Sequence, residues 1–219
     1  MPRSLVLSGG GRYADPWHPF AKTSARLADV LWSLGHRVEV TDFIADRVAD
    51  LSGFDLIVVN AAAGPGEAPA AHQAAQAGLR AALDRGVSVL AVHTGVCALL
   101  RLPEWEAVTG AAWVAGQSGH PKLGPAHVQP HPDRHPIVAG LPAFDLIDER
   151  YVGLRLAPGL VPLVTHRHDG RQYPLLWARE AGRSRVVADT LGHGVESYDC
   201  AGHRRLLTRS VEWLTEGAS

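Results

Sequence analysis

The stretch Val89-Leu-Ala-Val-His-Thr-Gly95 is the strongest indication of this chain's architecture. Its four apolar residues are typical of a strand buried inside a parallel sheet, and His93 and Gly95 follow at the spacing of a strand-to-helix elbow. Such an elbow exposes its central side chain beside free backbone N–H groups, and hydrolases and amidotransferases place a Ser or Cys nucleophile there. Imidazole is a poor acyl nucleophile but a good general base, metal ligand or hydrogen-bond partner. The sequence therefore argues against a glutaminase and makes His93 the first candidate for a functional role.

Strands and helices alternate on the N-terminal side of this elbow. Apolar runs predict the strands, and a glycine ends each stretch of helical periodicity. The expected strands are 4–8, 38–40, 54–60 and 87–92, and the expected helices are 20–34 and 68–85, with a further helix beginning at 96–100. This alternation predicts a right-handed doubly wound α/β layer, with its chemistry beyond the carboxyl ends of the strands.

The C-terminal half has a different pattern. Successive strands are expected at 161–168, 173–179 and 185–190, and an amphipathic helix at 203–215 closes the chain. Between the halves, residues 103–142 are rich in Gly, Pro, His and Trp and have little periodicity, which predicts a long structured loop or an inserted cap. Because no stretch has the composition of a linker, we expect a single domain over residues 1–219.

The composition excludes several classes of protein. A chain of 219 residues buries about two-thirds of its unfolded surface, so it needs no disulfide or metal to hold a core. It has 21 Lys and Arg against 22 Asp and Glu, a formal net charge of −1, and no run of like charge, so we expect no nucleic-acid partner. Two cysteines offer no disulfide framework, and the first apolar run is too short for a signal peptide or a membrane span. A cytoplasmic location without a membrane partner is therefore expected.

Acids and histidines beyond the elbow are the other candidates for chemistry. Asp148 and Glu149 form a pair of carboxylates that could supply an acid and a base or join a mixed metal site, or could be a solvated turn. His193 lies between two glycines, which would allow a ligand to approach closely, although a plain turn residue is an equal alternative. His18 follows the first strand and is expected at the same sheet edge as His93.

The sequence does not decide whether the protein binds a metal. His120, His127 and His131 lie in the irregular region without the i, i+4 spacing of a strong metal motif, so a divalent metal is possible but no cofactor is certain. Cys97 lies in an apolar run and is expected to be a small core residue. Of the six tryptophans, Trp17, Trp105 and Trp113 are the expected ligand contacts, and Trp32, Trp177 and Trp213 are expected in the core.

The order of several motifs resembles the trehalose-utilisation (ThuA-like) family. These are LSGGGRYADPWHPF (7–20), VLAVHTG (89–95), SGHPKLG (118–124), DRHPIVAGLPAFDLIDERYVGL (133–154), PLLWARE (174–180), GRSRVVADTLGHGVES (182–197) and RSVEWL (209–214). The resemblance implies a three-layer, flavodoxin-like fold similar to the class I glutamine amidotransferases, with helices on both faces of the sheet and a histidine in place of the elbow cysteine. The residues at the family's motif positions are His18, His93, His120, His135, Asp148, Glu149, Tyr151 and His193.

The resemblance also implies a role in carbohydrate catabolism, because family members accompany sugar dehydrogenases that produce 3-keto sugars. We expect an enzyme that processes a 3-keto disaccharide or a related glycoside by acid-base chemistry. His93, Asp148, Glu149 and His193 are its expected catalytic residues, and Trp17, His18, His120, His135 and Tyr151 are its expected substrate contacts. The alternatives are a non-catalytic sugar-binding or regulatory module and, less favoured, a hydrolase with Cys97 as its nucleophile. Self-association remains open.

Overall fold

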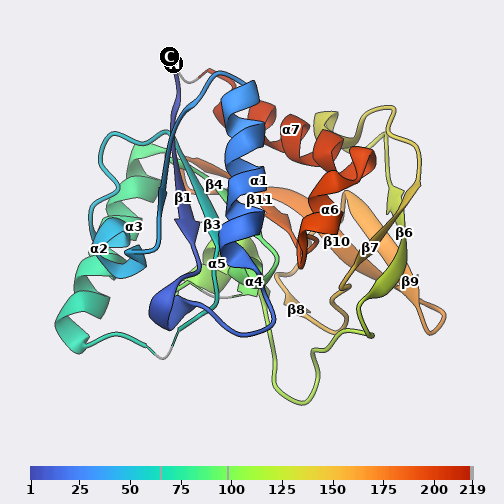
Figure 1. Cartoon of the computed structure of the whole chain (residues 1–219), viewed down its shortest axis with the longest axis horizontal. Coiled ribbons are helices and arrows are strands. Elements are labelled where there is room, and N and C mark those ends of the chain that lie inside the picture. The colour runs from blue at the N-terminus through green and yellow to red at the C-terminus, as the bar shows by residue number, and fades with distance from the viewer. Residues whose placement is uncertain (65, 98, 218–219) are drawn as a thin grey trace.

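The computed structural model describes residues 1–64, 66–97 and 99–217. Its main sheet has nine strands in the order β2-β1-β3-β4-β11-β10-β9-β6-β7. The first five are β2 (Arg37–Thr41), β1 (Arg3–Ser8), β3 (Leu56–Asn60), β4 (Ser88–Val92) and β11 (Ser184–Asp189), and they are all parallel. The remaining four are β10 (Arg171–Ala181), β9 (Val164–His168), β6 (Gly124–Pro130) and β7 (Phe144–Asp148), and each is antiparallel to its neighbour. In Figure 1 this antiparallel part lies on the right.

Helices cover both faces of the sheet, which confirms the expected α/β class. They are α1 (Phe20–Ser33), α2 (Ile44–Ala49), α3 (Pro69–Arg85), α4 (Thr94–Cys97), α5 (Trp105–Thr109), α6 (Val195–Asp199) and α7 (Ala201–Thr215). Two 3-10 turns, η1 (Gly11–Tyr13) and η2 (Pro136–Val138), and a small sheet of β5 (Ala111–Ala112) with β8 (Arg155–Leu156) complete the described elements.

Two apolar clusters, one on each face, hold the three layers together. Alternate residues of a strand face opposite sides, so Leu5 and Leu7 pack with α2 and α3, whereas Val6 packs with α1 and α7. All three are fully buried. Burial of such side chains contributes about 1.5–3 kcal/mol each, so the continuous apolar strands stabilise the sheet.

The irregular stretch 103–142 is more regular than its sequence suggests. It supplies β6 to the main sheet, where Gly124–Val128 pairs with β7 and Gln129 and Pro130 pair with β9. Pro and Gly within β6 conceal the strand's alternation, although Ala126, Val128 and Pro130 are all buried on one face. The expectation of a loop or cap is therefore wrong for these residues.

Two tryptophans also differ from expectation. Trp32 lies in α1 but is 56% exposed, because it falls outside the helix's buried stripe. Trp105 begins α5 in the core and donates its indole N–H to the carbonyl oxygen of Gly95 at 2.8 Å. Trp105 therefore holds the backbone of the elbow in place and is not available to a ligand.

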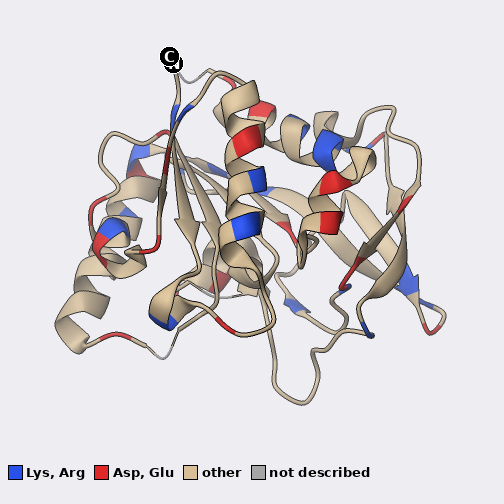
Figure 2. Cartoon of the chain, viewed as in Figure 1, with Lys and Arg blue, Asp and Glu red and all other residues tan. Residues whose placement is uncertain are grey.

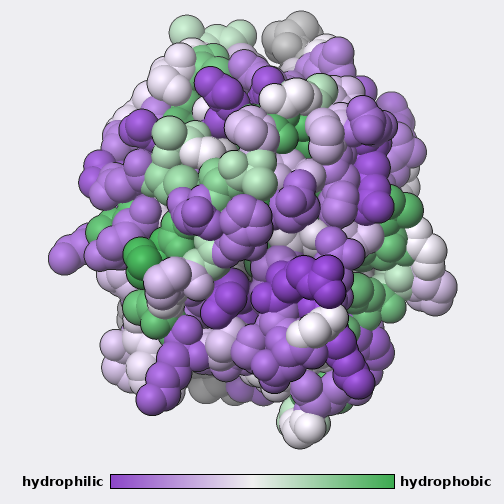
Figure 3. Space-filling model, turned by 90° about the vertical axis from the view of Figure 1, so that its right-hand side faces the viewer, coloured by the Kyte–Doolittle hydropathy of each residue, from purple (hydrophilic) through white to green (hydrophobic). Residues whose placement is uncertain are grey.

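The surface carries charges of both signs, and Figure 2 shows both basic and acidic residues on helix α1. The face beside the antiparallel strands is mostly hydrophilic, with small separated apolar areas (Figure 3). Among the described helices, none combines the length and the apolar character needed to cross a membrane.

Candidate functional site

The elbow predicted after β4 is present and holds His93 in a strained conformation. His93 has a φ of 50°, which non-glycine residues rarely adopt, and α4 begins at the next residue. Gly95 is required at this turn because a Cβ there would lie 2.3 Å from the backbone oxygen of Val59. The His93 backbone N–H donates to the Asp189 carbonyl at 2.7 Å, and its ring Nδ1 lies 2.8 Å from the Thr190 carbonyl oxygen. Because a carbonyl only accepts, Nδ1 carries a proton, and in the neutral form of the ring Nε2 has a lone pair.

His18 is oriented in the same manner by an acid in its own loop. The Asp15 carboxylate accepts the backbone N–H groups of Trp17 and His18 at 2.9 Å, and it lies 2.7–2.8 Å from His18 Nδ1. His18 Nδ1 therefore carries the proton, and its Nε2 lone pair points to His93 Nε2 at 3.1 Å. Two lone pairs at this distance repel one another unless a proton or a cation lies between them.

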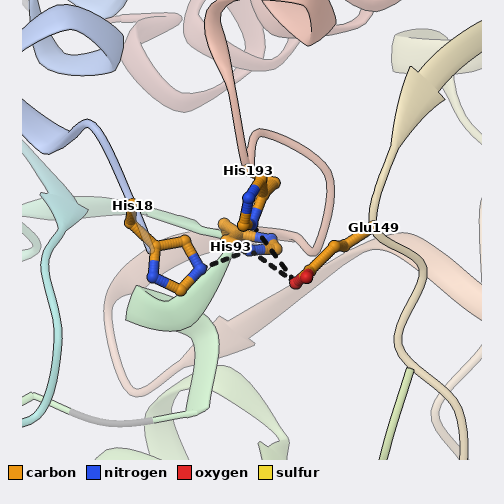
Figure 4. A group of neighbouring side chains, drawn as sticks. All are labelled: His18, His93, Glu149 and His193. Carbon is orange, nitrogen blue, oxygen red and sulfur yellow. Dashed lines mark hydrogen bonds and ion pairs between the residues drawn. The ribbon is translucent and has the colours of Figure 1, made fainter. Parts of the chain in front are cut away.

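Glu149 and His193 complete the group from the other side. Glu149 follows β7 and His193 follows β11, and the Glu149 Oε2 to His193 Nδ1 distance is 3.3 Å. Glu149 Oε2 also lies 3.6 Å from His93 Nε2. Figure 4 shows the three imidazoles and the carboxylate directed at a common centre from four separate segments of the chain.

The donor atoms of these four residues fit a metal ion. One ligand atom from each of His18, His93, Glu149 and His193 lies within 4.8 Å of all the others. Three of the spacings are 3.1, 3.3 and 3.6 Å, near the roughly 3.0–3.4 Å that separates adjacent ligands around an ion with bonds of about 2.0–2.1 Å. The buried His193 Nδ1 has no hydrogen-bond partner among the residues that the structure describes. Three nitrogens and one carboxylate suit zinc or another first-row divalent ion better than calcium or magnesium.

The hydrogen bonds to Nδ1 of His18 and His93 strengthen this interpretation. Metal-binding histidines usually donate their second ring N–H to a carboxylate or a backbone carbonyl, which fixes the ring and its tautomer. Asp15 does this for His18, and the Thr190 carbonyl does it for His93. We call His18, His93, Glu149 and His193 the ligand group.

Electrostatics favour the metal-binding forms of two members of the ligand group. Burial, followed by the neighbouring His93, lowers the pKa of His18, which keeps its imidazole neutral. Burial would raise the pKa of Glu149, but the neighbouring His193, His93 and His120 outweigh it and hold that pKa well below its usual range. The adjacent Glu149 carboxylate raises the pKa of His193, so a metal would displace a proton from this ring.

Asp148 lies beneath the ligand group rather than in it. Its carboxylate is fully buried and accepts the backbone N–H groups of Glu149, Gly192 and His193 at 2.7–3.0 Å and the Ser197 hydroxyl at 2.6 Å. Of the two adjacent acids, the structure therefore directs Glu149 to the site, and Asp148 holds the backbone around it.

Aromatic side chains form one wall beside the ligand group. The ring of Tyr151 lies 4.9 Å from that of His93 and 5.2 Å from Trp113, which is 41% exposed. Burial raises the pKa of Tyr151, so its phenol stays protonated. His120 is 39% exposed, and its Nδ1 lies 3.3 Å from Glu149 Oε1. Trp17, beside His18, is 72% exposed.

His135, an expected substrate contact, lies elsewhere, and Cys97 is unsuited to the nucleophile role of the less favoured alternative. His135 caps η2, where its Nδ1 accepts the Ile137 N–H, and its ring packs on Trp213 at 4.9 Å, away from the ligand group. Cys97 follows the elbow, and burial raises the pKa of its thiol to about 12, so it is not a thiolate at neutral pH.

Sequence reasoning missed Asp15, Ser197 and His203. The spacing Asp15-Pro-Trp-His18 is typical of an Asp side chain that bonds the backbone two or three residues on, and this signal could have found Asp15. Ser197 and His203 carry no local signal, because their contacts with Asp148 and Asp189 span 14 to 49 residues.

A family model described as trehalose utilisation (ThuA) matches residues 5–214. The chain belongs to the ThuA family. No curated protein has significant sequence similarity to it.

Solved structures of ThuA-like proteins share its fold. A putative ThuA-like protein from Parabacteroides merdae has a TM-score of 0.80 at 20% identity, over 99% of this chain and 91% of that one. A second, from Bacteroides uniformis, has a TM-score of 0.76 at 14% identity, over 98% of this chain and 91% of that one. A glutamine amidotransferase from Thermotoga maritima has a TM-score of 0.59 at 12% identity and covers 98% of both chains. These similarities establish the class I glutamine amidotransferase-like fold, in which this ThuA family member has His93 at the elbow.

Proposed function

We propose that this ThuA family member is a metal-dependent enzyme of carbohydrate catabolism that cleaves a 3-keto disaccharide or a related glycoside. The observation that carries the proposal is the ligand group, in which His18 and His93 direct Nε2 lone pairs at each other across 3.1 Å. An ordinary buried histidine satisfies both ring nitrogens, so facing lone pairs favour a cation site. The family's description supports a carbohydrate as the substrate.

A divalent metal in the ligand group would act as a Lewis acid on a sugar oxygen. With His18, His93 and His193 engaged as ligands, His120 is the neighbouring group best placed to move a proton. Its Nδ1 faces two acceptors, the Pro121 carbonyl oxygen at 3.0 Å and Glu149 Oε1 at 3.3 Å, so Nδ1 carries a proton, and in the neutral form of the ring Nε2 can accept another.

The proposed step is an elimination followed by hydration. The carbonyl of a 3-keto sugar acidifies the adjacent C–H, and His120 takes that proton as the glycosidic C–O bond breaks and a C=C bond forms. The departing oxygen takes up the proton that His120 has accepted and becomes a hydroxyl group. Water then adds across the double bond, so the net reaction consumes one water and releases two monosaccharides without an oxidant.

The aromatic wall gives a reason for a sugar to bind here. Indole and phenol rings pack on the apolar faces of pyranose rings. Tyr151 packs against His93, and the exposed indole of Trp113 packs against Tyr151. A disaccharide could therefore place its oxidised ring at the ligand group and its second ring against Trp113.

The test is NMR of the purified protein with a 3-keto disaccharide, with and without a chelator. We expect release of both monosaccharides, loss of release with chelator, and recovery on addition of Zn²⁺ or Mn²⁺. His120→Ala should lose turnover but keep the metal. His127→Ala is its matched control, because His127 is an exposed histidine paired with an acid, Asp145, outside the ligand group.

Two results would contradict the proposal. Turnover that survives complete removal of metal would exclude a metal-dependent reaction. Binding of the keto sugar without any turnover would instead favour the sugar-binding module.

A further inference from the structure

A buried hydrogen-bonded chain of four side chains lies below the ligand group. In order, it contains Asp189 at the end of β11, His203 in α7, Ser197 in α6 and Asp148 at the end of β7. All four residues are fully buried. His203 Nε2 lies 2.9 Å from Asp189 Oδ2, His203 Nδ1 lies 2.9 Å from Ser197 Oγ, and Ser197 Oγ lies 2.6 Å from Asp148 Oδ2.

The direction of each hydrogen bond follows from its partners. The Ser197 hydroxyl donates to the Asp148 carboxylate, so its oxygen is left to accept from His203 Nδ1. His203 Nε2 faces the Asp189 carboxylate, which also accepts. Both ring nitrogens of His203 therefore donate, and the ring is an imidazolium that joins two buried acids.

This order of hydroxyl, imidazole and carboxylate is that of a nucleophile triad, but Ser197 cannot act as one. Its oxygen is buried, and its proton is already committed to Asp148 rather than to the histidine. The chain therefore calls for a different role.

Both ends of the chain hold the backbone of ligand residues. At one end, Asp148 accepts the N–H groups of Glu149 at 2.8 Å and His193 at 3.0 Å. At the other end, the Asp189 backbone carbonyl accepts the N–H of His93 at 2.7 Å. Three of the four members of the ligand group are thus fixed by residues that His203 and Ser197 connect.

We infer that the buried chain Asp189–His203–Ser197–Asp148 positions the ligand group, with His203 as the positioning residue that sets the spacing of Glu149, His93 and His193. This inference rests on the proposed metal site. Outer partners of metal ligands typically contribute about 10- to 100-fold to metal affinity, and His203 would act in that range although it touches no ligand side chain.

The experiment compares His203→Gln and Ser197→Ala with His36→Gln. Glutamine carries both donor protons on one nitrogen and cannot donate to Asp189 and Ser197 from opposite ends of a ring. His36 is the matched control, because it is also a buried histidine bonded to a buried serine, Ser4, at 2.7 Å, but it lies at the amino ends of the strands. Ser197→Ala is the milder variant if His203→Gln does not fold.

Two readouts separate positioning from general stability. The first is the affinity for Zn²⁺ alone, measured by competition with a chromophoric chelator. The second needs no metal and is the hydrogen exchange of the Glu149, Gly192 and His193 amides by NMR. We expect His203→Gln and Ser197→Ala to weaken Zn²⁺ binding by about tenfold or more and to speed exchange at these amides. His36→Gln should change neither by more than about twofold, even where it lowers overall stability.

Equal affinity and equal amide exchange in His203→Gln and His36→Gln would overturn the inference. If the wild-type protein itself binds no Zn²⁺, the proposed function fails on that result alone. The positioning role of His203 is then decided by the amide exchange, where unchanged protection in both variants would refute it.

Discussion

The ligand group and His203 show two ways in which this fold uses histidine beside an acid. His203 is fully buried, and both of its ring nitrogens donate to acceptors, Ser197 Oγ and Asp189 Oδ2. In the ligand group, His18 and His93 have donated their Nδ1 protons outward, and their Nε2 lone pairs face inward at 3.1 Å. Burial alone does not distinguish the two, because His93 is only 1% exposed. The direction of the donors distinguishes them, since it leaves one group satisfied and the other in need of a cation.

The largest expected effect is the loss of one inward-facing nitrogen. His93→Ala should weaken Zn²⁺ binding by more than about 100-fold, beyond the range for outer partners, because it removes a ligand and opens the elbow. Isothermal titration calorimetry on the metal-free protein measures this. Unchanged affinity would place the metal elsewhere and end the comparison.

A smaller effect is expected from the acid that orients His18. Asp15→Asn should weaken Zn²⁺ binding by about 10- to 100-fold, because an amide holds the His18 tautomer less firmly than a carboxylate. The matched control is Asp145→Asn, since Asp145 bonds His127 Nδ1 at 2.7 Å on the exposed surface. Equal effects of the two substitutions would show that Asp15 has no special connection with the metal.

A third prediction uses pH to test the hydrogen bonds of His203. Burial would lower the pKa of His203, but the charge and hydrogen bond of Asp189 outweigh it and raise that pKa above its ordinary value of 6.5. A raised pKa in the folded state stabilises the protein below the ordinary pKa, and this contribution is lost as the pH rises through the raised value.

The measurement is the difference in free energy of unfolding between wild type and His203→Gln, by urea denaturation. It should be largest below about pH 6.5 and should fall at higher pH by at most about 1.4 kcal/mol per pH unit for one proton. Histidines shared by both proteins cancel in this difference. A difference that grows with pH would mean that His203 is neutral and that Asp189 holds the proton.

The smallest effect is expected at the thiol that follows the elbow. Burial raises the pKa of Cys97 to about 12, so Cys97→Ser should leave turnover within about twofold of wild type, because no thiolate is available to attack a substrate. Steady-state kinetics measure this, with iodoacetamide labelling as a second readout. Rapid labelling at neutral pH together with lost turnover would instead support the cysteine hydrolase.

The sequence determined much of the parallel part of this protein. Continuous apolar runs predicted β1, β3 and β4 within two residues of their observed bounds. Strands that are buried on both faces are apolar at every position, so they can be recognised from the sequence alone. The step from Val92 to His93 and Gly95 predicted the elbow for a local steric reason, since only glycine fits against Val59. The sequence and its family resemblance also named all four members of the ligand group.

Only the tertiary structure decided what these residues do together. The ligand group comes from loops after β1, β4, β7 and β11, whose spacing depends on the order of the strands in the sheet. The tertiary structure also directs Glu149 to the site while Asp148 bonds the backbone. It places His135 at η2 against Trp213, and it pairs His203 with Asp189. Local sequence does not encode these outcomes, because the partners that fix His93 and Asp148 lie 97 and 44 residues away along the chain.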